Sequence, residues 1–163
     1  MIGPDDPLWF AVLLVKFGAP LFLATPNSMY VAGSRESEFS FPREWQHSLP
    51  GRSSLSTWSE GDAVCAVTGV AFDVVDVDPR NGGNVDAERD ALAEHGVTVL
   101  AEVRTPGVGA HFYVEASGRP KSNNQHGIDF QAAGGMVFVP PTIRPKYRGL
   151  GYAVIHARGL GDA

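Results

Sequence analysis

Two patterns of hydrophobic and polar positions along the chain predict two kinds of element. Apolar residues fill nearly every position of Leu8–Phe17, which follows a proline suited to a first helical turn; this predicts a buried helix ending near Gly18. The mixed segment Asp86–His95 predicts a second helix, capped by Asn84 and stopped by Gly96. The 19 glycines and 12 prolines indicate many turns, so we expect few long helices.

Short apolar runs bounded by glycine, proline or polar residues predict strands. The polar segment Gly33–Thr57 predicts a loop with a short helix around Arg43–His47, and we expect Trp45 and Trp58 to pack on the core. Gly134–Gly135 predicts a hairpin turn joining the strands on either side of it. Strands therefore dominate, which predicts a single α+β domain over residues 1–163, built on a largely antiparallel sheet with a few flanking helices. The predicted strands are Pro20–Ala24, Tyr30–Val31, Ala63–Val67, Val70–Val77, Val97–Glu102, Ala110–Glu115, Ile128–Ala132, Met136–Val139 and Tyr152–His156.

Two carboxylates, Asp76 and Asp78, stand at the end of one apolar run. Side chains alternate between the faces of a strand, so these two acids point one way while Val75 and Val77 point the other. Like charges held this close are costly without a cation, and carboxylates suit a hard divalent ion. On its own, an Asp-x-Asp also commonly caps a loop or faces solvent, so the motif needs support from the rest of the chain.

A glycine-rich loop, Arg104–Gly109, runs into a strand that begins near His111. Gly107 and Gly109 allow backbone amides to approach a phosphate, and His111 can donate a hydrogen bond to it. Together with Arg104, these residues are candidates for holding a triphosphate. A histidine at a strand start also serves purely structural roles.

A lone acid, Asp129, lies between apolar residues in a predicted strand. Burying an unpaired charge is expensive, so a partner is expected. A bound cation would supply one; a salt bridge to an arginine such as Arg104 is the alternative.

The net charge of −5 argues against a protein that is basic all over. The later part of the chain is locally basic, and we take four of its cations as weaker candidates for nucleic-acid contact: Lys121, Arg144, Lys146 and Arg148. The single cysteine, Cys65, excludes an internal disulfide framework and a Cys/His zinc module. No signal peptide and no run of about 20 apolar residues is recognisable, so the expected location is cytoplasmic, with no membrane partner.

The order of these pieces is more specific than any one of them. Asp-x-Asp, then Gly-x-His at His111, then the lone Asp129, then a strand ending in Val-Pro-Pro-Thr resembles the archaeo-eukaryotic primase superfamily. Within it, the chain looks most like the bifunctional DNA primase/polymerase N-terminal domains of phage, plasmid and actinobacterial proteins, over about residues 8–155. The resemblance implies that Asp76, Asp78 and Asp129 are the catalytic, metal-binding acids and that His111 contacts the phosphates of the incoming nucleotide.

That resemblance implies template-directed nucleotidyl transfer, as DNA primase and/or DNA polymerase, in the replication of phage, plasmid or mobile-element DNA. Two Mg²⁺ or Mn²⁺ ions suit such a carboxylate site and this chemistry. The expected partners are nucleoside triphosphates, a single-stranded DNA template and, because no Walker A pattern occurs, a helicase in trans. The family often carries a lysine in the loop after the first strand, but Thr25–Ser28 has none.

Two alternatives remain open from the sequence. One is a non-catalytic module that binds nucleotide or single-stranded DNA within a replication complex. The other is a different metal-dependent transferase, such as a sugar-nucleotide enzyme with an Asp-x-Asp site.

Overall fold

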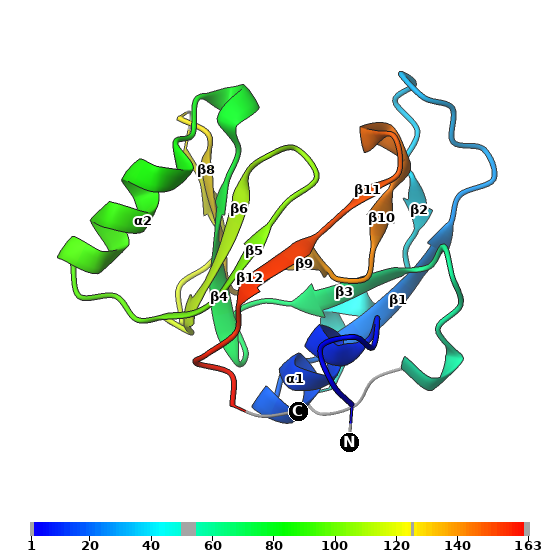
Figure 1. Ribbon diagram of the computed structural model, residues 1–163. Helices are drawn as coiled ribbons and strands as arrows, with labels where there is room; N and C mark the ends of the chain where they lie inside the picture. The colour runs from blue at the N-terminus through cyan, green and yellow to red at the C-terminus, as the bar shows by residue number, and fades with distance from the viewer. Residues whose placement is uncertain (1, 50–54, 125, 162–163) are drawn as a thin grey trace.

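The computed structural model describes residues 2–49, 55–124 and 126–161, which form two β-sheets flanked by helices (Figure 1). The α-helices of these residues are α1 (Trp9–Phe17) and α2 (Val85–Glu94). The strands are β1 (Leu21–Pro26), β2 (Phe39–Ser40), β3 (Ala63–Val67), β4 (Phe72–Val77), β5 (Val99–Arg104), β6 (Ala110–Glu115), β7 (Ser122–Asn123), β8 (Ile128–Gln131), β9 (Met136–Val139), β10 (Ile143–Arg144), β11 (Leu150–Gly151) and β12 (Ala153–His156).

The strands pair antiparallel throughout both sheets. The larger sheet has the order β12-β5-β6-β4-β8-β7, and the smaller has the order β2-β1-β3-β9. The short strands β10 and β11 form a separate antiparallel ribbon. This arrangement confirms the predicted α+β class with a largely antiparallel sheet.

The main core lies where α1 meets both sheets. Phe10, Leu13 and Leu14 of α1 pack there with residues of β3, β4, β5, β6 and β9. The opposite face of the larger sheet packs on α2 through Leu92, and Figure 1 shows α2 lying outside that sheet. Strand β4 is therefore covered on both faces, which explains its nearly continuous apolar sequence.

The ends of both helices follow the signals read from the sequence. Gly18 adopts the left-handed conformation (φ 102°) that closes α1, and its N–H donates to the carbonyls of Leu14 and Val15. The side chain of Asn84 accepts from the Ala87 amide at 2.9 Å, which caps α2. Trp45 and Trp58 pack against core clusters, as predicted.

Two strand predictions are wrong. Tyr30–Val31 is not a strand; β1 pairs with β3 on one side and with the two-residue edge strand β2 on the other. Gly134–Gly135 does not close a hairpin, because β8 pairs with β4 in the larger sheet while β9 pairs with β3 in the smaller one. The chain crosses between sheets at this turn, where the Thr68 hydroxyl donates to the Ala132 carbonyl at 2.7 Å.

The bounds of other elements differ from the predicted ones by a few residues. The long loop predicted before β3 contains β2 and short 3₁₀ turns at Trp45–His47 and Leu55–Thr57, while positions 50–54 of that prediction lie outside the described residues. The loop predicted at Ser117–Gln125 contains the short edge strand β7, and Gln125 also lies outside. No helix in the described ranges is long and apolar enough to cross a membrane.

Candidate active site

Three of the predicted site residues form one row across three neighbouring strands. Asp76 on β4 is paired directly with His111 on β6 and with Asp129 on β8. Directly opposed residues of antiparallel strands place their side chains on the same face. The sheet therefore brings together residues that are up to 53 positions apart in the sequence.

The end of β4 aims both aspartates into one cleft. Val75 and Val77 pack into the cluster beneath α2, so the alternating positions face the other way. Asp76 and Asp78 both line a cleft of about 180 Å³, together with His111. The prediction that the two aspartates share a side is confirmed.

His111 is held between a carboxylate and an aromatic ring. Its Nε2 lies 3.4 Å from Asp76 Oδ1, and its ring centroid lies 5.6 Å from that of Tyr152. The imidazole is buried, and among the described residues its Nδ1 has no hydrogen-bond partner. These contacts fix the ring so that the Nε2 edge faces the cleft.

Asp78 is fully engaged with its own turn. Its Oδ1 accepts from the amide and Nε of Arg80, both at 3.0 Å, and its Oδ2 accepts from Arg80 Nη2 at 2.8 Å. A fourth hydrogen bond comes from Asn81 Nδ2 at 3.0 Å. The hydrogen bonds from the Arg80 side chain are the main reason that the pKa of Asp78 lies below its usual range, despite partial burial.

The pKa of Asp129 is shifted in the opposite direction from that of Asp78. Burial is the main cause that raises its pKa, and the negative charges of Asp76 and Asp78 raise it further. In the part of the chain that the structure describes, no hydrogen bond or ion pair neutralises this carboxylate. It borders a second hollow, of about 320 Å³, lined also by Lys121, Ser122, Asn123 and Gln131.

Arg104 does not supply the partner that Asp129 lacks. Arg104 and Glu102 lie on the same face of β5, and Glu102 binds Arg89 of α2 with Nη2–Oε1 at 2.5 Å. Val103, between them, is the residue paired with His111. Arg104 is thus exposed on the face opposite the carboxylates, and its position does not support the predicted contact with the triphosphate.

The acids are only partly assembled for a metal ion. Across residues 2–49, 55–124 and 126–161, no three His, Cys, Asp or Glu side chains are gathered so that they could hold one together. Asp76 and Asp129 nevertheless fit a divalent cation, because they are opposed across one strand pair and Asp129 carries an uncompensated charge. Asp78 borders the same cleft but is occupied by Arg80.

The glycines of the loop before β6 have different surroundings. Gly107 borders the cleft. Gly109 lies against the end of β4, where a Cβ would meet the Val77 carbonyl oxygen at 2.1 Å, and its N–H already donates to Thr105 Oγ1 at 3.1 Å. Gly109 therefore has a structural reason to be glycine, separate from any phosphate.

A basic segment closes the cleft from the other side. It runs from β10 through a 3₁₀ turn, Pro145–Tyr147, and contributes Arg144, Lys146 and Tyr147 to the lining. Arg144 is only 13% exposed and binds Glu38 Oε1 through Nη2 at 2.6 Å, whereas Lys146 and Arg148 are exposed. Among the four predicted nucleic-acid contacts, Arg144 is thus the one already paired with a carboxylate.

Several residues that shape the site gave little signal in the sequence. Glu38 binds Arg144 from 106 positions away, with no local pattern that marks it. Tyr152 accepts from Arg144 Nη1 at 2.9 Å and faces His111. Burial raises the pKa of Tyr152 to about 12, so its hydroxyl stays neutral at pH 7. Arg80 directly follows the Asp-x-Asp-Pro run, and that spacing was the only available signal for it.

Comparison with known families gives a match over most of the chain. The family model described as bifunctional DNA primase/polymerase, N-terminal, matches residues 23–162. A search of curated protein sequences finds no match. The family match spans all the residues placed in the site above.

Proposed function

The chain belongs to the family of bifunctional DNA primase/polymerase N-terminal domains, and from that premise we propose that it catalyses template-directed nucleotidyl transfer at Asp76, Asp129 and His111. The observation that carries the proposal is the row formed by these three residues across β6, β4 and β8. Two carboxylates and an imidazole thus lie side by side on one face of the sheet: Asp76 and His111 border the polar cleft, and Asp129 borders the neighbouring hollow. This supports binding of a triphosphate, which needs both a cation and a hydrogen-bond donor.

The chain's own residues have separable tasks in this reaction. Asp76 and Asp129 would hold one or two divalent cations, Mg²⁺ or Mn²⁺, with Asp78 as a further ligand if Arg80 releases it. When bound, such ions activate the attacking hydroxyl and neutralise the charge of the triphosphate. His111 would donate from Nε2 to a phosphate oxygen in exchange for its contact with Asp76.

The lining opposite the carboxylates supports binding of a polyanion. Lys146 and the Arg80 guanidinium border the cleft, and Gly107 presents backbone there without a side chain. Arg144 lies deeper and keeps Tyr152 against His111. Charge-assisted hydrogen bonds from such groups bind and orient phosphates.

Primer extension on a single-stranded template with Mn²⁺ or Mg²⁺ tests the proposal. Wild type and Asp90→Asn, which changes an exposed acid on α2, should both incorporate nucleotides. Asp76→Asn and Asp129→Asn should each abolish incorporation while keeping the wild-type circular dichroism spectrum. His111→Ala should raise the KM for nucleotide more than it weakens template binding. Incorporation by Asp76→Asn at the wild-type rate would remove that residue from the reaction.

A specific observation favours a second candidate, a binding module without turnover. Asp78 is saturated by four hydrogen bonds, and no group of three acids is assembled among the described residues. Absence of incorporation by folded wild type, with nucleotide binding retained, would identify that function.

A further inference from the structure

A larger hollow, of about 610 Å³, lies beside the candidate active site. One wall is the loop before and around β2, and the other is the basic segment after β10. Four residues line both this hollow and the cleft at Asp76: Arg80, Arg144, Lys146 and Tyr147. The two spaces are therefore adjacent, on either side of these four residues, so a ligand longer than one nucleotide at the carboxylates would reach the hollow.

Aromatic rings line much of this hollow. They come from both walls: Tyr30, Phe39, Phe41, Phe138 and Tyr147. Phe39 is almost completely buried, whereas Phe41 is 39% exposed. The Phe41 ring is braced by Phe138, with centroids 6.1 Å apart, and by Phe22 at 6.3 Å. An exposed ring on a rigid aromatic base offers a flat apolar surface to a ligand.

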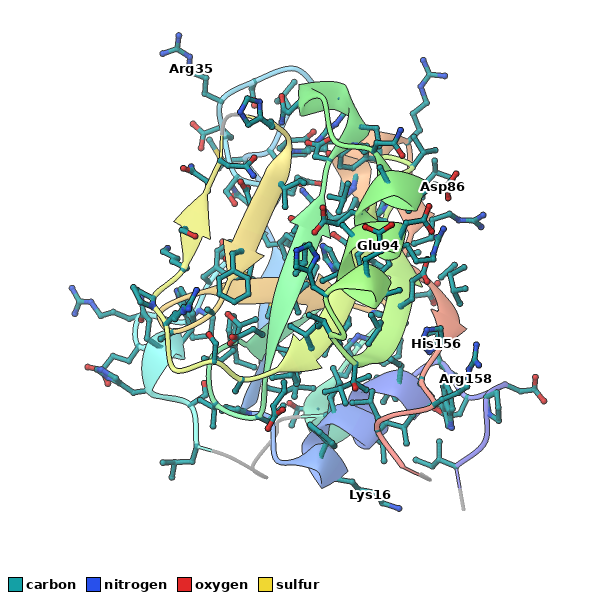
Figure 2. The ribbon with its side chains drawn as sticks, turned by 90° about the vertical axis from the view of Figure 1, so that its left-hand side faces the viewer. Lys16, Arg35, Asp86, Glu94, His156 and Arg158 are labelled. Carbon is teal, nitrogen blue, oxygen red and sulfur yellow. The ribbon has the colours of Figure 1, made fainter. Side chains whose placement is uncertain are left out.

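Cations border the same rings. Arg35 and Lys146 line the hollow and form no salt bridge with a described residue. Figure 2 shows the Arg35 side chain extending away from the body of the molecule. Of the acids in the lining, Glu38 is neutralised by Arg144, and Glu36 remains. This edge is locally cationic on a chain whose net charge is −5.

We propose that this hollow binds unpaired bases of single-stranded DNA, with Phe41 and Tyr30 stacking on them and Arg35 and Lys146 meeting the phosphates. Rings that stack bases beside cations that follow the backbone are the recurring means by which proteins hold single strands. This inference rests on the proposed function, because it takes the bound strand to be the template of the reaction at the carboxylates.

The distribution of charge favours a strand over the base of a free nucleotide. A nucleotide carries its charge in the triphosphate, which the cations at the inner end, Arg80 and Lys146, would satisfy. Arg35 lies at the outer rim and is absent from the lining of the cleft at Asp76. A further cation at that end suits a ligand with phosphates along its length.

The test compares two oligonucleotides of equal length and charge, a fluorescent dT20 and the same backbone with abasic sites. Anisotropy titrations at low ionic strength use the full chain without nucleotide. Base stacking contributes about 1–3 kcal/mol per base, so each stacked base should make wild type bind dT20 about 5- to 140-fold more tightly than the abasic strand. Phe41→Ala and Tyr30→Ala should each reduce that ratio towards one.

Matched variants separate stacking from charge and from folding. Arg35→Ala should weaken both strands by the same factor, whereas Arg119→Ala, an exposed cation outside the hollow, should change neither. Phe41→Leu keeps apolar bulk beside Phe138 and should still lose the preference for bases. Thermal unfolding identifies any variant that fails to fold, and Tyr30→Ala then carries the test alone.

The outcomes distinguish this proposal from the proposed function. Asp76→Asn should lose nucleotide incorporation yet keep the wild-type ratio between the two strands. A wild-type ratio of one, or an unchanged ratio in folded Phe41→Ala and Tyr30→Ala, would overturn the stacking proposal whatever the activity. A raised nucleotide KM in Phe41→Ala with unchanged strand binding would also overturn it and assign the hollow to the nucleotide's base.

Discussion

Asp129 lies directly opposite Asp76 in the ladder between β8 and β4, and no described residue forms a hydrogen bond or ion pair with its side-chain carboxylate. Burial and the nearby charges of Asp76 and Asp78 raise its pKa. A carboxyl group with a raised pKa in the folded state favours the fold only while protonated. Its ionised form at neutral pH therefore costs stability, as is common for residues retained for function.

Asp129→Asn should raise the Tm at pH 7, because the substitution removes an unfavourable charge. The protonated wild-type carboxyl stabilises the fold fully below the pKa that it has in the unfolded state. This stabilisation is lost as the pH rises through the pKa that it has in the folded state. The advantage of the variant should therefore shrink as the pH is lowered towards the folded pKa of Asp129, which thermal unfolding across a pH series would measure. Adding Mn²⁺ should raise the Tm of wild type more than that of the variant. A variant less stable than wild type at pH 7 would contradict this account.

Arg80 competes with any cation for Asp78. The Arg80 side chain is 53% exposed, and pairs of this kind are worth about 0.2–1 kcal/mol. Arg80→Ala should raise the pKa of Asp78 towards its usual range, as measured from the carboxyl carbon by NMR. It should also tighten Mn²⁺ binding, by up to about fivefold.

The matched control for Arg80 is Arg148→Ala, an exposed cation on the basic segment that forms no bond with Asp78. It should leave both the pKa and the Mn²⁺ affinity unchanged. Weaker Mn²⁺ binding in Arg80→Ala would mean that Arg80 organises Asp78 for the metal instead of withholding it.

The ion pair between Glu38 and Arg144 fastens the basic segment to the loop before β2. Both side chains are largely shielded, at 7% and 13% exposed, and Glu38 also accepts from the Lys146 amide at 3.0 Å. Burial opposes ionisation of Glu38, but the hydrogen bonds from Arg144 and Lys146 outweigh it and lower the pKa. Glu38→Gln should reduce the free energy of unfolding by about 3 kcal/mol, because Arg144 is left without its counter-charge.

Urea unfolding at several pH values would test the Glu38 prediction. A lowered pKa means that the stabilisation is present above the unfolded pKa and is lost as the pH falls through the folded pKa. The difference between wild type and Glu38→Gln should therefore close in acid. Glu36→Gln, two positions earlier and exposed, should match wild type throughout. If wild type remains more stable than Glu38→Gln in acid, the loss of stability comes from packing instead of charge.

The sequence predicted which segments form helices and strands better than it predicted which strands pair with one another. Alternation along β4 placed Asp76 and Asp78 on the side opposite Val75 and Val77 because that signal is local. The hairpin expected at Gly134–Gly135 failed because a glycine turn does not specify whether the next strand joins the same sheet.

The contacts around the site depended on residues far apart in the chain. Glu38 lies beside a two-residue strand, too short to leave a periodic pattern, and meets Arg144 only in the folded protein. Likewise, Arg104 lies near His111 in the sequence, but side chains alternate along β5, so the Arg104 side chain lies on the face opposite that of His111. Local periodicity thus predicted the side that Asp76 and Asp78 share, whereas contacts between distant residues, such as that of Glu38 with Arg144, came from tertiary structure.

Gly109 is the point where the loop before β6 touches the end of β4. A Cβ at this position would lie 2.1 Å from the Val77 carbonyl oxygen and 3.1 Å from Pro79 Cδ, and backbone atoms cannot yield as a flexible side chain does. Gly109→Ala should therefore destabilise the protein by about 1–3 kcal/mol, as measured by urea unfolding. Gly3→Ala, where a Cβ meets nothing within 4 Å, should be neutral. Because the strain falls next to Asp78, Gly109→Ala should also lower the rate of primer extension. Full stability in Gly109→Ala would show that the contact with Val77 relaxes freely, and it would return this glycine to the phosphate role predicted from the sequence.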